Sequence, residues 1–177
     1  WIVDPLDGTS NYVRGLSDFA VSIALEVDGT LQIGVIYRPL TDDLYAATRD
    51  GTVPDNAIML STSATDQPKS SLAAISYSSS QTDRQIVWES HRRIGSAVEG
   101  IRSSGSGALD LAYLAAGKID AVCGFDHSRW DSAAGLLLVE AAGGSVTHGT
   151  AEYENDGDFV ASNGPLHSNF TRYVRGN

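Results

Sequence analysis

The first fifty residues carry a different pattern from the rest of the chain, and this contrast constrains the fold most. Apolar residues alternate loosely in three segments, which predicts strands at 18–27, 31–37 and 44–48. Asp28-Gly29 is a hairpin signal, and Asp50-Gly51 closes the set. We therefore expect an antiparallel meander, followed by a polar segment, 52–70, that forms loop and one short strand.

After residue 70 the pattern predicts that helices and strands alternate. The helices expected from apolar spacing, caps and stop signals are 83–94 (with Asp83 as its cap), 106–116, 132–142 and 166–175. The strands expected between them are 73–77, 101–103, 121–124, 145–148 and 159–162. Antiparallel strands first and helix–strand alternation later predict an α/β fold of layered sheets.

Composition bounds the class of protein. At 177 residues the chain is long enough for one domain with a sizeable core, and its 42% apolar and 19% charged residues are typical of globular proteins. The net charge of −10 argues against a nucleic-acid-binding face, and no apolar run is long enough to span a bilayer. The single cysteine, Cys123, stands in an apolar stretch, which predicts a buried thiol in a reducing, cytoplasmic setting.

Two carboxylates stand close together near the start, in Trp1-Ile2-Val3-Asp4-Pro5-Leu6-Asp7-Gly8-Thr9-Ser10-Asn11. Pro5 suits the second position of a tight turn, which would bring Asp4 and Asp7 together after a short apolar strand. Their charges repel, and a hard divalent cation is the simplest compensation. Gly8 and Thr9 add N–H groups and a hydroxyl beside that charge, as a phosphate next to a metal would require.

A third carboxylate begins a later segment, Trp130-Asp131-Ser132-Ala133-Ala134-Gly135. Asp131 stands just before an apolar run that Gly143-Gly144 ends. Taken alone, this residue reads as a helix N-cap with a structural role.

The two acidic segments together resemble the inositol monophosphatase family. Asp-Pro-Leu-Asp-Gly-Thr-Ser-Asn is followed more than a hundred residues later by Trp-Asp-Ser-Ala-Ala-Gly and Glu-Ala-Ala-Gly-Gly, with Arg102-Ser103-Ser104-Gly105-Ser106 between them. The resemblance runs from Trp1 to about Asn163. It implies a stacked α-β-α-β sandwich and a Mg²⁺-dependent phosphatase that hydrolyses a small-molecule phosphate monoester, works as a homodimer and binds neither nucleic acid nor membrane.

The resemblance also implies roles for particular residues. Asp4, Asp7, Asp131 and the backbone carbonyl of Leu6 would hold two metals, and Thr9 would orient the attacking water. The substrate would be contacted by a set of small residues, Gly8, Thr9, Ser79, Gly105, Ser106 and Gly107. The structural alternatives are that the Thr9 hydroxyl only forms a turn or cap, and that the glycines only allow entry into the next helix.

One position departs from the family pattern. The resemblance places a hydroxyl-binding Glu six residues before Trp130, where this chain has Gly124, and Asp126 lies two residues further on. The substrate therefore stays open between inositol phosphate, histidinol phosphate, fructose 1,6-bisphosphate and a nucleotide 3′-phosphate. His127 is a candidate for lining the pocket, and Trp1 and Trp130 are expected to pack around the ligand loops.

The resemblance implies a further segment before Trp1, with another metal-binding Glu and an acidic residue that orients water. We therefore expect residues 1–177 to be the C-terminal part of a single phosphatase domain. The alternative from a different class is a non-catalytic fragment that binds a partner or dimerises.

Overall fold

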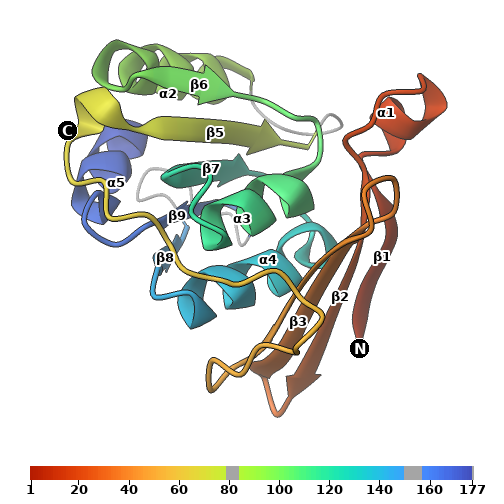
Figure 1. The fold of residues 1–177 in the computed structure, drawn as a ribbon. Coiled ribbons are helices and arrows are strands. Elements are labelled where there is room, and N and C mark those ends of the chain that lie inside the picture. Colours follow the sequence, from red (N-terminus) through yellow and green to blue (C-terminus); the bar gives the residue numbers. More distant parts are fainter. Residues whose placement is uncertain (79–83, 150–156, 177) are drawn as a thin grey trace.

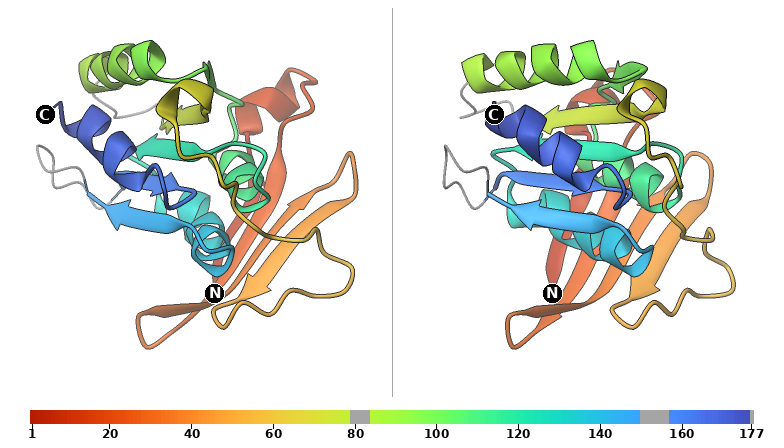
Figure 2. Two further views of the ribbon diagram at one scale, coloured as in Figure 1. Left: turned by 60° about the vertical axis from the view of Figure 1, so that its left-hand side comes forward. Right: turned by 90° about the vertical axis from the view of Figure 1, so that its left-hand side faces the viewer.

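The computed structural model describes residues 1–78, 84–149 and 157–176, which stack in layers (Figure 1). One sheet contains β1–β4, and a second contains β5–β9. Helices α3 and α4 fill the space between the two sheets, while α2 and α5 cover the outer face of the second sheet (Figure 2). The predicted layered α/β architecture is confirmed.

The first sheet is an antiparallel meander. Its strands are β1 (Ile2–Asp7), β2 (Ala20–Val27), β3 (Thr30–Arg38) and β4 (Asp43–Thr48), and they pair in this order. The predicted hairpin joins β2 to β3, where Asp28 and Gly29 both adopt positive φ, 50° and 74°. Such a two-residue turn matches the twist of the strands it connects.

The tight turn predicted for Asp4 to Asp7 is wrong, because β1 continues through both residues. The pairing of β1 with β2 shifts between Asp4 and Asp7, so the strand is irregular there without reversing direction. Pro5 is tolerated because β1 is an edge strand of its sheet. The irregularity still brings the two carboxylates to the same end of the strand.

The segment between the two sheets contains no strand in residues 49–67, so the short strand predicted within 52–70 is wrong. A 3₁₀ turn, η1 (Pro68–Ser70), stands at its end instead. The segment is held by single hydrogen bonds, such as Ile58 N to Leu44 O at 2.7 Å and Asn163 Nδ2 to Thr65 O at 2.7 Å. These contacts satisfy backbone groups without a ladder.

The second sheet is mixed. It contains β5 (Leu72–Tyr77), β6 (Gly100–Arg102), β7 (Ala121–Phe125), β8 (Ser145–His148) and β9 (Phe159–Ser162), in the order β6-β5-β7-β9-β8. β5 pairs in parallel with β6 and β7, whereas β9 is antiparallel to β7 and β8. The helix–strand alternation predicted after residue 70 accounts for the parallel part.

The helices are α1 (Thr9–Val13), α2 (Arg84–Ala97), α3 (Gly107–Ala115), α4 (Arg129–Ala141) and α5 (His167–Arg175). The short α1 was not predicted, and Asp83, the expected cap of α2, lies outside the described residues. α3 is buried along nearly its whole length, and α4 is buried from Ser132 to Val139. Their close approach requires glycine at position 135, because a Cβ there would lie 2.5 Å from Leu111 Cβ.

Three remaining expectations concern burial and the membrane. Cys123 is buried, and desolvation raises the pKa of its thiol to about 12, so it is a structural thiol at neutral pH. Trp1 and Trp130 are 76% and 53% exposed, so their expected packing around the ligand loops is wrong. In the part of the chain that the structure describes, no helix is long and apolar enough to cross a membrane.

Candidate metal and phosphate site

The structure brings the carboxylates of Asp4, Asp7 and Asp131 together. Their side-chain oxygens lie within 4.8 Å of one another although the residues come from both halves of the chain. Asp4 pairs with Ser22 in the β1–β2 register, and Ser22 Oγ donates to Trp130 O at 3.3 Å. The start of α4 is therefore fixed against the strand beside β1.

Asp131 is not the N-cap of α4, so the prediction that it caps this helix is wrong. The helix begins at Arg129, with Ser128 as its N-cap, and Asp131 is the third helical residue. Its Oδ2 accepts a hydrogen bond from Ser128 N at 3.1 Å, as in a capping box. The helix starts earlier than the apolar run indicated because Arg129 and Trp130 form an exposed first turn.

The protein fixes one oxygen of each carboxylate. Asp4 Oδ1 accepts from Leu6 N at 2.9 Å, and Asp131 Oδ2 accepts from Ser128 N. Asp7 Oδ2 accepts from Ala108 N at 2.9 Å and from the Ser106 hydroxyl. These bonds hold the three carboxylates in fixed orientations within the cluster.

The site accumulates negative charge. Burial raises the pKa of Asp7, and the charges of Asp4 and Asp131 raise it further against hydrogen bonds from Ser106 and Ala108 that lower it. The pKa of Asp4 is raised mainly by burial and also by Asp131. Three oxygen donors at this spacing fit a hard divalent cation such as Mg²⁺, which would relieve the repulsion.

The turn after β1 needs glycine at position 8. Gly8 has φ of 81°, and a Cβ there would lie 2.7 Å from Asp18 O. Thr9 begins α1, and its hydroxyl donates to Leu6 O at 2.8 Å. This bond is the turn alternative for Thr9, and metal binding by the Leu6 carbonyl stays a prediction. The water-orienting role of Thr9 and phosphate contact by Gly8 and Thr9 stay predictions.

Ser106 links the carboxylate cluster to α3. Its side chain caps the helix by accepting from Leu109 N at 3.3 Å, and its hydroxyl donates to Asp7. The residue is fully buried, so the structure gives it a supporting position behind Asp7. The predicted substrate contacts of Gly105, Ser106 and Gly107 stay predictions, and Ser79 lies outside the described residues.

Asn11 is a supporting residue to which sequence reasoning gave no role. Its Nδ2 donates to Asp18 O at 2.6 Å and to Ser104 O at 2.8 Å, so it ties the turn after β1 to the loop before α3. Gly105 lies against it with φ of 83°, and a Cβ there would come within 3.0 Å of the amide. The only signal was its place in the acidic motif, because the partner loop is distant in sequence.

The position that departs from the family pattern is filled by an aromatic ring. A Cβ on Gly124 would lie 2.2 Å from Phe159 Cε1, and Phe159 is buried. The His127 ring lies beside this ring, with centroids 5.5 Å apart and planes tilted by 51°, and its Nδ1 lies 3.8 Å from Asp131 Oδ2. Asp126 adopts φ of 55°, and its backbone N donates to Asp158 Oδ1 at 2.8 Å. A Glu at 124 would require Phe159 to move.

The layered α/β fold, with carboxylates that converge beside glycine turns, is the fold of the inositol monophosphatase class. Residues 1–176 match the model of the inositol monophosphatase family, and the chain belongs to this family. An inositol-1-monophosphatase of Mesorhizobium japonicum is 40% identical over 167 residues, which cover 92% of this chain and 62% of that protein. The Nus factor SuhB of Pseudomonas aeruginosa is 37% identical over 168 residues, with the same two coverages.

Solved structures agree with this assignment. The inositol monophosphatase of Anabaena superposes with a TM-score of 0.90 at 34% identity, covering 99% of this chain and 71% of that one. The suppressor protein SuhB of Bartonella henselae superposes with a TM-score of 0.89 at 35% identity, covering 98% and 68%. The chain thus spans about three fifths of the length of the curated relatives it matches.

Proposed function

We propose that these residues belong to a Mg²⁺-dependent phosphatase that hydrolyses a small-molecule phosphate monoester. The observation that carries the proposal is the convergence of Asp4, Asp7 and Asp131 within 4.8 Å. Carboxylates crowded in this way are costly unless a cation joins them, and all-oxygen donor sets favour Mg²⁺. Membership in the inositol monophosphatase family supports the reaction class.

Each residue has a proposed task. Asp4, Asp7, Asp131 and the Leu6 carbonyl hold the cation, which when bound supplies charge neutralisation and activation of water. The N–H groups of Gly8 and Thr9 orient the phosphate beside it, and the Thr9 hydroxyl orients the water. Ser106 and Asn11 are positioning residues, because they fix Asp7 and the loop before α3.

We propose that the substrate is the phosphate ester of a small alcohol, and that the enzyme does not strongly prefer inositol phosphate to other esters. The support is that Phe159 occupies the space beside Gly124 where the resemblance places a hydroxyl-binding Glu. Relatives carry the name inositol-1-monophosphatase, and an inositol monophosphate-bound structure of a staphylococcal relative is 25% identical. Histidinol phosphate, fructose 1,6-bisphosphate and nucleotide 3′-phosphates remain the alternatives. Homodimer formation, cytoplasmic location and the single-domain assignment stay predictions.

Two measurements test this function. Residues 1–177 should bind Mn²⁺, used as a calorimetric probe for Mg²⁺, at a site that Asp7→Asn weakens strongly. The protein in its natural full length should release phosphate from small phosphate monoesters only when Mg²⁺ is present. Metal binding that Asp7→Asn leaves unchanged, or phosphate release that persists in excess EDTA, would contradict the proposal.

A second candidate function comes from the relatives named Nus factor SuhB, which are 35–37% identical to this chain. Under this alternative the fold serves as a binding module and the carboxylate cluster is not needed. The acidic net charge of −10 favours a protein partner over direct contact with nucleic acid. A variant with Asp4, Asp7 and Asp131 all changed to Asn decides between them, since only the phosphatase function should be lost.

A further inference from the structure

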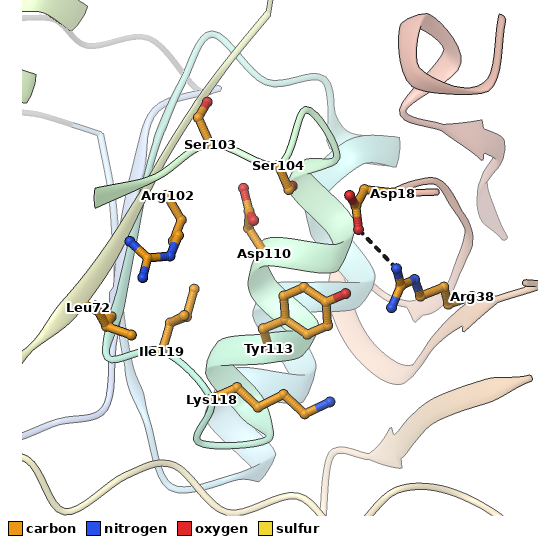
Figure 3. Close-up of a pocket in the computed structure, with 10 residues that line it drawn as sticks. All are labelled: Asp18, Arg38, Leu72, Arg102, Ser103, Ser104, Asp110, Tyr113, Lys118 and Ile119. Atoms are coloured by element: carbon orange, nitrogen blue, oxygen red, sulfur yellow. Dashed lines mark hydrogen bonds and ion pairs between the residues drawn. The ribbon is translucent and has the colours of Figure 1, made fainter. Parts of the chain in front are cut away.

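A cavity of about 550 Å³ lies beside the loop that precedes α3 (Figure 3). The cluster of Asp4, Asp7 and Asp131 does not line it, although Ser106 in the same loop holds Asp7. The cavity is lined by residues of β3, β5, β6 and α3 and of the loops before β2 and on either side of α3, namely Asp18, Arg38, Leu72, Arg102, Ser103, Ser104, Asp110, Tyr113, Lys118 and Ile119.

The lining has a surplus of positive charge in an acidic protein. Arg38, Arg102 and Lys118 face it, although the chain as a whole carries a net charge of −10. Of the two acids in the lining, Asp18 is paired with Arg38 at 3.0 Å. Burial raises the pKa of the other, Asp110, to about 7, so its charge is incomplete at neutral pH. Among the described residues neither Arg102 nor Lys118 forms an ion pair with a carboxylate, although Arg102 donates to Ile101 O at 3.0 Å, so both charges are available to an anion.

The cations are placed around an apolar floor. Figure 3 shows Arg102 and Lys118 at separate edges of the cavity, with Tyr113 and Ile119 between them. Lys118 Nζ is held 3.0 Å from the Tyr45 hydroxyl and 5.1 Å from the centre of the Tyr113 ring. A fixed ammonium loses less entropy on binding a ligand, and an apolar floor suits a short carbon skeleton.

Two polar atoms of the lining residues lack a hydrogen-bond partner in the described part of the chain. They are Arg38 Nε, a donor, and Asp110 Oδ2, an acceptor, and both are buried. Asp110 is only 2% exposed as a residue. Buried polar groups without partners are costly, so a ligand that supplies both an acceptor and a donor gains free energy here.

From this combination we propose that the cavity is a binding site for a small hydroxylated dianion. Arg102 and Lys118 bind its negative charge, carried by two carboxylates or by one phosphate, and a ligand hydroxyl donates to the buried carboxyl of Asp110. The hydrocarbon part of the ligand lies on Tyr113 and Ile119. Carboxylate and phosphate groups share the recognised chemistry, so the source of the anion is decided by experiment.

Calorimetry on the metal-free protein tests the site, because the carboxylate cluster without a cation repels anions. The probes are malate, succinate (which lacks the hydroxyl) and glycerol 3-phosphate. We expect malate or glycerol 3-phosphate to bind with Kd below about 1 mM. Succinate should bind about tenfold more weakly, because it leaves Asp110 Oδ2 without a donor. The tighter of the two hydroxylated probes identifies the anion.

A matched pair of variants locates the binding. Arg102→Gln with Lys118→Gln should weaken it at least about tenfold. Arg92→Gln with Lys69→Gln removes the same charge from exposed positions outside the lining and should leave affinity unchanged. The proposal is overturned if no probe saturates, if both pairs weaken binding equally, or if the first pair has no effect. It is also overturned if Arg102→Gln with Lys118→Gln dissociates a dimer without changing probe affinity. That result would mean that the two cations bind an acidic side chain of a second copy of the chain instead of a small anion.

Discussion

At the scale of single residues, Asp131 has a structural and a chemical role that one substitution separates. Asp131→Asn keeps an oxygen that can accept the hydrogen bond from Ser128 N, so the start of α4 should survive. The charge that would hold a cation is lost. In the protein of natural full length, we expect the proposed Mg²⁺-dependent phosphatase activity to fall by at least about a hundredfold, with the unfolding temperature nearly unchanged.

The matched control is Ser128→Ala, which removes a cap side chain and keeps the carboxylate. It should lower stability by about 1 kcal/mol and leave Mg²⁺-dependent turnover largely intact. Near-normal turnover in Asp131→Asn at moderate Mg²⁺ would reduce Asp131 to a capping residue. Phosphate release and thermal unfolding are the two measurements.

Asp110 gives a pH-dependent prediction. Burial raises its pKa from an ordinary 3.8 to about 7. Because the folded pKa lies above the unfolded one, the ionised form destabilises the fold, and the cost develops as pH rises from about 4 to about 7. Asp110→Asn does not titrate, so over this range its free energy of unfolding should rise relative to wild type by about 1 to 3 kcal/mol.

Urea unfolding of both proteins at several pH values measures this difference. The metal is omitted so that binding at the carboxylate cluster does not contribute. A difference between the two proteins that is constant from pH 4 to pH 8 would show that Asp110 is not held in its neutral form.

At the scale of elements, the N-terminus of α3 and the end of β1 are coupled through Ser106. Its hydroxyl caps the helix and also donates to Asp7, so Ser106→Ala removes both contacts. We expect a loss of about 1 kcal/mol in stability and about a tenfold weaker affinity for Mn²⁺. Ser106→Thr keeps the hydroxyl and should retain both properties. Unchanged Mn²⁺ affinity in Ser106→Ala would show that Asp7 is positioned by Ala108 N alone.

The elements also show what local sequence predicts and what it does not. The Asp28-Gly29 hairpin followed from residues that tolerate positive φ, and the layers followed from the change of pattern after residue 70. The turn at Asp4 was mispredicted because Pro5 also suits an irregular edge strand, and edge position depends on pairing. The start of α4 was mispredicted because Arg129 and Trp130 are exposed, which apolar spacing cannot indicate.

For the site, sequence named the three carboxylates but not what surrounds them. The carboxylates belong to recognisable motifs, whereas the burial of Ser106, the two bonds of Asn11 and the ring beside Gly124 depend on contacts between distant segments. Phe159 was predicted only as a strand residue. Its position against β7 is set by the antiparallel β7–β9 register, in which Gly124 pairs with Phe159.

At the scale of the whole molecule, the packing of Phe159 against Gly124 bears on substrate choice. The Phe159 side chain, from β9 of the second sheet, fills the place where the resemblance implies a hydrogen-bonding carboxylate. A site without such a group loses discrimination, because rejecting a wrong substrate depends on leaving buried polar groups unpaired. We therefore expect kcat/KM for inositol 1-phosphate to lie within about tenfold of the values for the alternatives, namely histidinol phosphate, fructose 1,6-bisphosphate and phosphoadenosine phosphate.

The comparison of kcat/KM on these four substrates, with the protein in its natural full length, has an internal control. Gly124→Glu alone should destabilise the protein, because its Cβ would lie 2.2 Å from Phe159 Cε1. Gly124→Glu combined with Phe159→Ala makes room for the carboxylate and should shift preference towards inositol 1-phosphate. A strong preference for inositol 1-phosphate in the unmodified protein would mean that another group, such as Asp126, binds the hydroxyls. In that case Gly124→Glu with Phe159→Ala should not increase the preference for inositol 1-phosphate.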